Sequence, residues 1–163
     1  MQKKISQIYK TLIWNETVSL AVLDTTALIN EAIRRHSLTP VAAAALGRTL
    51  TASAYLCSWL KNKAGSLSVT VDGGGAGGKI FVSGDGSLNM RGFIADPAVQ
   101  LPPRADGKLD VGACVGKNGT LRVVQDDGRG IPFVGTSELV SGEIAEDFSA
   151  YFLTSEQRPT EIG

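Results

Sequence analysis

The sequence predicts an α/β domain of the α+β type, in which a mostly antiparallel sheet packs against a long helix rich in small residues and a C-terminal helix. Three observations lead to this fold class. The 163 residues suit one domain, and 43% hydrophobic with 20% charged residues is typical of a packed globular core. Apolar residues alternate with polar ones over several short runs after Gly65, as strands require. Two other segments carry apolar residues at helical spacing.

The N-terminal part predicts one strand and one short helix. Val18, Leu20 and Val22 alternate with polar or small residues inside the stretch 11–23, which indicates a half-buried strand. Residues 24–26 then offer N-cap side chains for a helix that ends near the cationic residues 34–36.

A long helix is expected to follow. Thr39 and Pro40 form a helix start signal, a capping residue followed by proline at the first helical position. Ala42 to Ala45 have high helix propensity, and we expect the helix to continue to about Lys61. Its small side chains would let another element approach closely.

The next segment predicts an antiparallel meander of three strands. Residues 67–71 alternate with period two, 79–83 form a second apolar run, and 88–94 a third. Glycine-rich turns at 73–78 and 84–86 separate them, which favours hairpin connections.

The remainder adds two extended segments and a helix. Residues 100–110 indicate a surface loop, 120–125 a strand, and 131–140 one more extended segment. Ser141 is expected to cap the last helix and Pro159 to stop it. The apolar face of that helix is formed by Ile144, Phe148, Tyr151 and Phe152.

Charge and hydropathy exclude several classes of protein. Sixteen basic and sixteen acidic residues cancel, which argues against a dedicated nucleic-acid binder. Residues 1–63 carry 8 basic and 3 acidic side chains (net +5) and 64–163 carry 8 and 13 (net −5), an asymmetry that solvated helix faces explain. Neither a signal-peptide pattern nor an apolar run of membrane-spanning length is present, so we expect a soluble cytoplasmic protein.

Residue types that could support catalysis or cofactor binding form no clear signature. The run 73–78 followed by Lys79 superficially matches a phosphate-binding loop, which leaves a nucleotide-binding enzyme as an alternative, but strand-like residues follow it and favour a glycine-rich hairpin loop. His36 is the only histidine and suits a helix C-terminus. Cys57 and Cys114 lack metal-ligand spacing. We expect no enzyme and no cofactor in this chain.

Several segments of the chain, taken together in order and spacing, resemble one family. They are Arg35-His36, 39–53 (TPVAAAALGRTLTAS), 71–75 (VDGGG), 115–121 (VGKNGTL), 141–148 (SGEIAEDF) and 154–159 (TSEQRP). In this combination the chain resembles the 33 kDa chaperonins, a family of bacterial redox-regulated heat-shock holdase chaperones. The resemblance covers nearly the whole chain.

The resemblance implies an ATP-independent chaperone core that binds unfolded or misfolded client proteins through exposed apolar surface. Phe81, Phe93 and Val124, on the predicted strands, are our candidate client contacts. The resemblance also implies a C-terminal module in relatives, in which four cysteines bind zinc and act as an oxidation switch. Cys57 and Cys114 match no position of that module.

The sequence ends at Gly163, where relatives of the family continue with further strands, a linker and the zinc module. We therefore expect residues 1–163 to be a single chaperone core domain, truncated at its C-terminus, without zinc and without the redox switch. Missing strands would leave a sheet edge or an apolar face uncovered, which predicts a homodimer or strand exchange with another copy or fragment. An inactive structural fragment is the other alternative.

Overall fold

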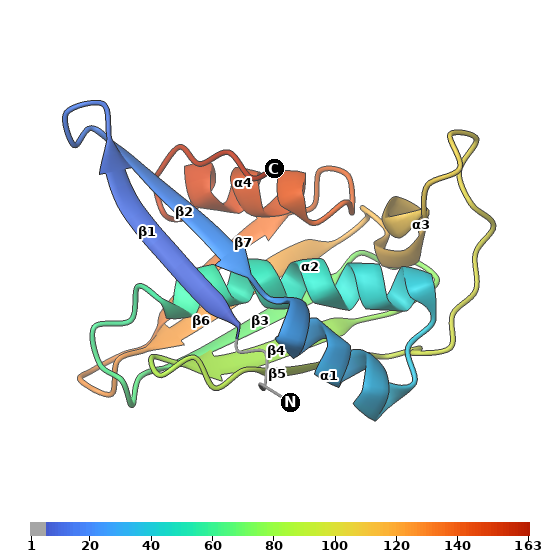
Figure 1. The fold of residues 1–163 in the computed structure, drawn as a ribbon, viewed down its shortest axis with the longest axis horizontal. Helices are drawn as coiled ribbons and strands as arrows, with labels where there is room; N and C mark the ends of the chain where they lie inside the picture. Colours follow the sequence, from blue (N-terminus) through green and yellow to red (C-terminus); the bar gives the residue numbers. More distant parts are fainter. Residues whose placement is uncertain (1–5) are drawn as a thin grey trace.

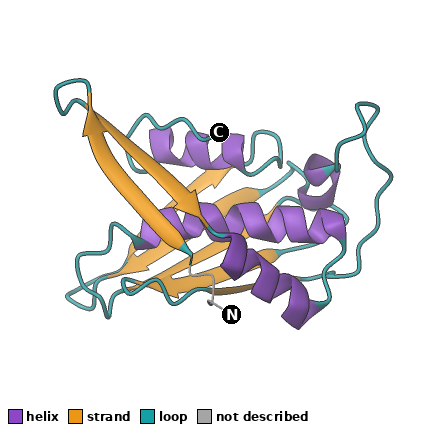
Figure 2. Cartoon of the chain, in the orientation of Figure 1, coloured by secondary structure: helices purple, strands orange, loops and turns teal. Residues whose placement is uncertain are grey.

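The structure is a computed structural model that describes residues 6–163 in two sheets and four helices (Figures 1 and 2). The strands are β1 (Gln7–Ile13), β2 (Val18–Asp24), β3 (Ser66–Asp72), β4 (Ile80–Asp85), β5 (Arg91–Ile94), β6 (Thr120–Asp126) and β7 (Phe133–Glu138). The helices are α1 (Thr26–His36), α2 (Pro40–Cys57), α3 (Val111–Val115) and α4 (Ala145–Thr154). The α+β fold class predicted from the sequence is confirmed.

The larger sheet has five strands in the order β5-β4-β3-β6-β7, and every neighbouring pair is antiparallel. The predicted meander is therefore correct, since β3, β4 and β5 pair in chain order. β1 and β2 form a separate two-stranded hairpin. Figure 1 shows three layers: the sheet at the back, α2 and α4 in front of it, and the hairpin lying across α2.

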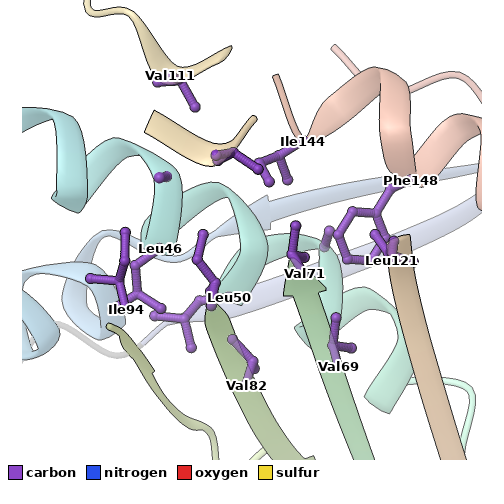
Figure 3. Close-up of a cluster of buried hydrophobic side chains, with 14 of the residues drawn as sticks. Leu46, Leu50, Val69, Val71, Val82, Ile94, Val111, Leu121, Ile144 and Phe148 are labelled. Atoms are coloured by element: carbon purple, nitrogen blue, oxygen red, sulfur yellow. The ribbon is translucent and has the colours of Figure 1, made fainter. Parts of the chain in front are cut away.

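The hydrophobic core lies between the sheet and α2 (Figure 3). Because side chains alternate along a strand, every second residue of β3, β4 and β6 points at the helices, and these residues are fully buried. Leu46 and Leu50 of α2 meet them from the other side. The strand residues are Leu67, Val69, Val71, Ile80, Val82, Leu121 and Val123.

Small residues in α2 allow close packing on both sides of the helix. Ala42 and Ala45 are completely buried, and a side-chain Cβ at Gly47 would lie only 3.2 Å from Ile29 of α1. The helix is thus buried between the sheet and the outer elements, which explains why its hydrophobic residues are not confined to one narrow stripe.

Four details of the sequence-based fold were wrong. The stretch 11–23 is not one strand: it contains the end of β1, a turn at 14–17 and most of β2, and residues 7–10 were not recognised as part of a strand. α3 was missed because five residues show too little periodicity. α2 ends at Cys57, four residues before the predicted end at Lys61.

The start of the last helix was also misplaced. α4 begins at Ala145, and Ser141 does not cap it: the Ser141 hydroxyl accepts the N–H of Glu143 in the preceding turn. Asp147 instead reaches back to the N–H of Ile144, the residue just before the helix, at 2.9 Å. The helix ends at Thr154, before Pro159 could stop it.

Candidate functional site

The three candidate residues chosen from the sequence lie on the same face of the five-stranded sheet. The strand alternation places Phe81, Phe93 and Val124 opposite the buried residues, on the face that α2 and α4 do not cover. Phe93 is 48% exposed, and Phe81 and Val124 are partly exposed. Among the described residues no helix covers this outer face, although Phe81 and Phe93 at its β5 edge line a groove together with α1; we call it the open sheet face.

The open sheet face carries two apolar pairs with polar residues between them. Phe81 and Phe93 are directly paired across β4 and β5, with ring centroids 5.9 Å apart. Val124 is paired with Val134, which is 48% exposed, across β6 and β7. Ser68 and Thr70 of β3, and with them Arg122 of β6, lie between the pairs. The surface therefore mixes apolar contact points with hydrogen-bonding groups.

A second exposed apolar surface lies on the hairpin, and the sequence reasoning missed it together with β1. Opposed residues of an antiparallel pair point to the same side. One side of the hairpin is largely apolar except at the end where Gln7 pairs with Asp24, and we call it the hairpin face. Its members are Tyr9 (60% exposed), Thr11, Ile13, Val18 (37%), Leu20 (45%) and Val22 (57%). Residues 7–13 do not alternate between polar and apolar, so the one signal for this surface was the alternation of Val18, Leu20 and Val22 in the neighbouring strand.

The opposite side of the hairpin is turned toward α2. The Lys10 ammonium donates a hydrogen bond to the carbonyl of Ser58 at 3.0 Å and lies 5.6 Å from the ring centre of Tyr55. Partial burial lowers the pKa of Lys10. Thr25, just after β2, shares a 2.7 Å hydrogen bond with Thr51 of α2. These contacts hold the hairpin against the helix and leave the hairpin face free.

A groove of about 1120 Å³ runs between the hairpin and α2. One side is β2, whose second edge pairs with no other strand in the described chain, and the small residues Ala43, Ala44 and Gly47 of α2 form its floor. The C-terminal residues 160–163 line its far end. The groove is therefore bordered by an unpaired strand edge.

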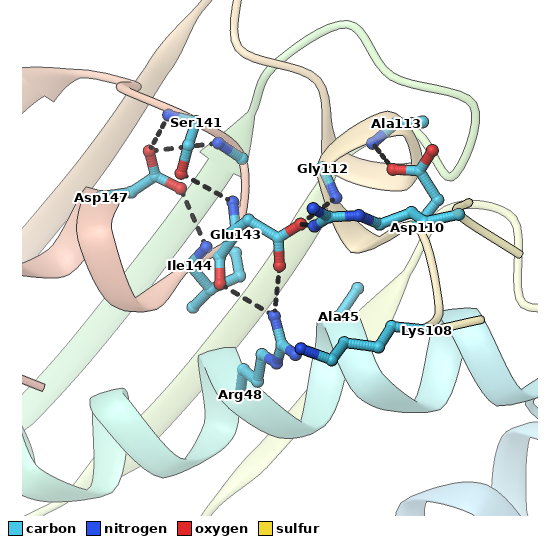
Figure 4. Close-up of polar contacts among 12 residues, drawn as sticks. Ala45, Arg48, Lys108, Asp110, Gly112, Ala113, Ser141, Glu143, Ile144 and Asp147 are labelled. Atoms are coloured by element: carbon cyan, nitrogen blue, oxygen red, sulfur yellow. Dashed lines mark hydrogen bonds and ion pairs between the residues drawn. The ribbon is translucent and has the colours of Figure 1, made fainter. Parts of the chain in front are cut away.

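Arg48, Arg104 and Glu143 line part of this groove and form a charged cluster, whose polar contacts are drawn in Figure 4. The Glu143 carboxylate is 2.7 Å from Arg48 of α2 and 3.1 Å from Arg104 of the long loop. Next to it, the completely buried Asp147 accepts hydrogen bonds from four backbone N–H groups, and Ile144 has a left-handed φ of 69°. The turn is strained at a β-branched residue, and buried hydrogen bonds hold it in place.

The glycine run forms a structural joint and not a phosphate cradle. The N–H groups of Gly75, Ala76 and Gly77 donate to carbonyls of α3 and its C-terminus, at 3.0, 3.2 and 2.8 Å. A Cβ at Gly73 would lie 2.2 Å from the carbonyl oxygen of Gly116, so a side chain does not fit there. Because these amides are already bonded and β4 follows the loop, the geometry of a nucleotide-binding loop is not formed.

The thiols and the histidine are not brought together. Cys57 and Cys114 are both fully buried. Burial raises the pKa of the Cys57 thiol to about 12 and also raises that of Cys114. Within residues 6–163 no three His, Cys, Asp or Glu side chains are grouped as metal ligands, so the described residues do not fit a zinc site.

None of the helices in the described part of the chain combines the length and the apolar character needed to cross a membrane.

Comparison with known proteins gives a consistent result. Residues 6–163 match the family model described as "Hsp33 protein". The chain is 43% identical over 157 residues to a 33 kDa chaperonin of Alkaliphilus metalliredigens and 49% identical over 138 residues to one of Thermosynechococcus vestitus. These alignments cover 96% and 85% of this chain, but only 54% and 46% of the relatives.

The fold matches a solved structure as well. The crystal structure of the 33 kDa chaperonin (heat shock protein 33 homolog) from Thermotoga maritima superposes with a TM-score of 0.86 at 37% identity. The match covers 93% of this chain and 52% of that one, so the chain spans about half the length of the relatives it resembles. The relatives are named chaperonins, and the open apolar faces described above suit this class of protein, the chaperones. The chain belongs to the Hsp33 family.

Proposed function

We propose that this chain is a holdase core, which binds unfolded or misfolded client proteins without ATP and catalyses no reaction. The observation that carries the proposal is the open sheet face, where Phe81, Phe93 and Val124 lie together on a surface that no other described element covers. The glycine run, with its amides bonded to α3, supports a mechanism that does not use a nucleotide.

The chemistry of the open sheet face suits varied partners. Burying exposed apolar area is favourable at about 25 cal/mol per Å² and does not depend on a particular sequence. Two aromatic rings at one end and two valines at the other would contact apolar client residues. Ser68, Thr70 and Arg122 between them would supply hydrogen bonds to the client backbone. The open sheet face would therefore bind many different exposed apolar segments and would discriminate little among their sequences.

The test is suppression of light scattering when a chemically unfolded client is diluted into buffer. Phe93→Ser is expected to weaken suppression, because it removes the most exposed ring of the open sheet face, and to change thermal stability little. Phe133→Ser is the matched control: Phe133 is 46% exposed but lies on the helix-covered side of β7. Equal suppression by both variants and by the unchanged chain would refute the client role of this face.

We also propose that two copies of the chain associate through the hairpin face. A two-stranded hairpin with apolar residues on both sides is marginal by itself, and the hairpin face is apolar from Val18 to Val22, with its one charged residue, Asp24, at the end of the strand. The unpaired edge of β2 adds a route for strand exchange.

Sedimentation measures this association directly. The unchanged chain is expected to sediment as a dimer at micromolar concentration, and Val22→Arg, which places a charge on the hairpin face, to shift it to monomer. Arg122→Glu on the open sheet face is the control for a charge change elsewhere. A monomer at all concentrations would contradict the proposal.

The chain is proposed to act in the cytoplasm as one chaperone domain, without a bound cofactor. The buried positions of Cys57 and Cys114 support a role in packing and not in metal binding.

A further inference from the structure

A second, smaller groove lies between α1 and β5. It has a volume of about 630 Å³, within the range of ligand-binding clefts. Its apolar lining is formed by Leu28 and Ala32 of α1 and Met90, just before β5, which also pack against the hydrophobic core, and by Phe81 and Phe93 at the edge of the open sheet face. The groove is thus a continuation of the core toward solvent along one side of the sheet.

The groove borders an unpaired edge of the sheet. β5 is the outermost strand, and its other edge pairs with no described strand. The N–H of Ala95 donates a hydrogen bond to the carbonyl of Lys79, which directly precedes β4, so Ala95 and Lys79 form a hydrogen-bonded pair. In the same register Phe93 is paired with Phe81, two residues further along each strand. Hydrogen-bonded pairs alternate along an antiparallel ladder. The N–H and C=O groups of Gly92 and Ile94 therefore point away from β4.

These backbone groups have no partner among residues 6–163. No hydrogen bond from the N–H of Gly92 or of Ile94 to any group outside the sheet ladder is formed in the described chain. Their spacing, two residues apart, is the spacing at which another extended strand presents its own carbonyls and amides. A chain four residues long, matching β5, would satisfy them.

The charges around the groove point to one kind of occupant. Arg35, His36 and Arg91 line it, and its only acidic residue is Glu31, whose carboxylate is already bonded to Arg34 and Arg35. The groove lining can therefore form ion pairs through its cationic groups, but it has no unpaired carboxylate. A negatively charged partner is favoured over a positively charged one.

We propose that the groove between α1 and β5 binds an extended segment of a client polypeptide by strand addition, and that it prefers segments in which apolar residues alternate with acidic ones. The apolar side chains of the segment would point into the lining formed by Leu28, Ala32 and Met90. Its backbone would pair with Gly92 and Ile94. This inference rests on the proposed chaperone function and names the kind of client segment that the chain selects.

The edge is also limited in ways that suit transient binding. β5 has only four residues and begins with the charged Arg91, two features with which proteins restrain uncontrolled pairing at an edge. A segment bound here gains few ladder hydrogen bonds, so release needs no input of energy beyond thermal motion.

The test uses two fluorescein-labelled seven-residue peptides, one alternating valine with glutamate and one alternating valine with lysine. Fluorescence anisotropy is expected to show at least threefold tighter binding of the glutamate peptide to the 163-residue chain. In hydrogen exchange measured by NMR, the same peptide is expected to slow exchange of the Gly92 and Ile94 amides at least fivefold.

Two variants locate the binding charge. Arg35→Glu, which lines the groove, is expected to weaken binding of the glutamate peptide at least threefold. Arg34→Glu is the matched control: it makes the same charge change next to Glu31 but does not line the groove, and should leave the affinity within twofold.

The outcomes separate this inference from the proposed function. Equal affinity for both peptides, equal effects of the two arginine variants, or binding without protection of Gly92 and Ile94 would each overturn the groove assignment. Failure of the chain to suppress client aggregation while the peptide still protects these amides would overturn the holdase function and leave the groove as a peptide site.

Discussion

Replacement of Asp147 by asparagine tests the turn that starts α4. The Asp147 carboxylate is completely buried, and its Oδ1 accepts N–H groups of Val140, Ser141 and Gly142 at 2.7, 3.0 and 3.3 Å. Its Oδ2 accepts the N–H of Ile144 at 2.9 Å. All four partners are donors, so the site needs a group that only accepts hydrogen bonds.

Asparagine has nearly the same shape but offers one oxygen and one donor nitrogen. In its better orientation the oxygen keeps the three N–H groups near Oδ1, and the nitrogen then faces the Ile144 N–H. An unpaired buried N–H costs about 1–3 kcal/mol, and three charge-assisted hydrogen bonds become weaker neutral ones. Removing a buried charge offsets part of this loss. We expect a loss of about 3–4 kcal/mol in the free energy of unfolding.

Urea denaturation monitored by circular dichroism measures the loss, and the melting temperature should fall by about 10 °C. Asp110→Asn is the control, because Asp110 accepts the Ala113 N–H at 2.9 Å as the N-cap of α3 and asparagine caps a helix about as well. A loss below about 1 kcal/mol for Asp147→Asn would show that the four hydrogen bonds do not hold this turn.

Three further predictions concern the stability of the fold. The pKa of the Cys57 thiol is raised to about 12 in the folded chain, so the stability that this neutral buried thiol contributes is complete below pH 9 and is lost as pH rises toward 12, by up to about 1.4 kcal/mol per pH unit. In urea denaturation from pH 8 to 10, the free energy of unfolding should therefore decline less steeply for Cys57→Ala than for the unchanged chain. Parallel declines would refute this prediction. Gly119→Ala should lower the free energy of unfolding by more than about 2 kcal/mol, because the new Cβ would lie 1.9 Å from the Asp72 carbonyl oxygen. Gly130 has open space around it, so Gly130→Ala should change the free energy of unfolding by less than about 0.5 kcal/mol. Similar melting temperatures for the two variants would contradict this. Tyr151→Phe removes the 2.7 Å, partly buried hydrogen bond that the Tyr151 hydroxyl donates to Glu156, and it should cost about 1 kcal/mol in the same urea assay; an unchanged free energy of unfolding would contradict this.

Local patterns were sufficient for much of the fold. The alternation in 67–71 and the glycine turns at 73–78 and 84–86 predicted β3 to β5 and their antiparallel order. Thr39 and Pro40 marked the start of α2 correctly. These features succeed because period-two burial, turn geometry and helix initiation depend on neighbours in the chain.

Longer-range features escaped the sequence. The strand β1 was missed because residues 7–13 do not alternate between polar and apolar and most of their side chains are exposed, so the pattern of a half-buried strand is absent. The start of α4 was misplaced because the capping hydrogen bond is made by Asp147, the third residue of the helix, which accepts the N–H of Ile144 just before the helix. The glycine run looked like a phosphate-binding loop until its amides were seen to bond with α3, nearly forty residues away in the chain.

The sequence by itself determined the fold class, most of the strands and helices and the family, because these follow from periodicity, composition and motifs read along the chain. It also placed Phe81, Phe93 and Val124 on strands, but not on a common face. Only the tertiary structure decided that they share the open sheet face, that the hairpin face is uncovered, and that α1 and β5 border a groove. The physical reason is that a surface is defined by what fails to pack against it, and packing between distant segments is settled only when the whole chain has folded.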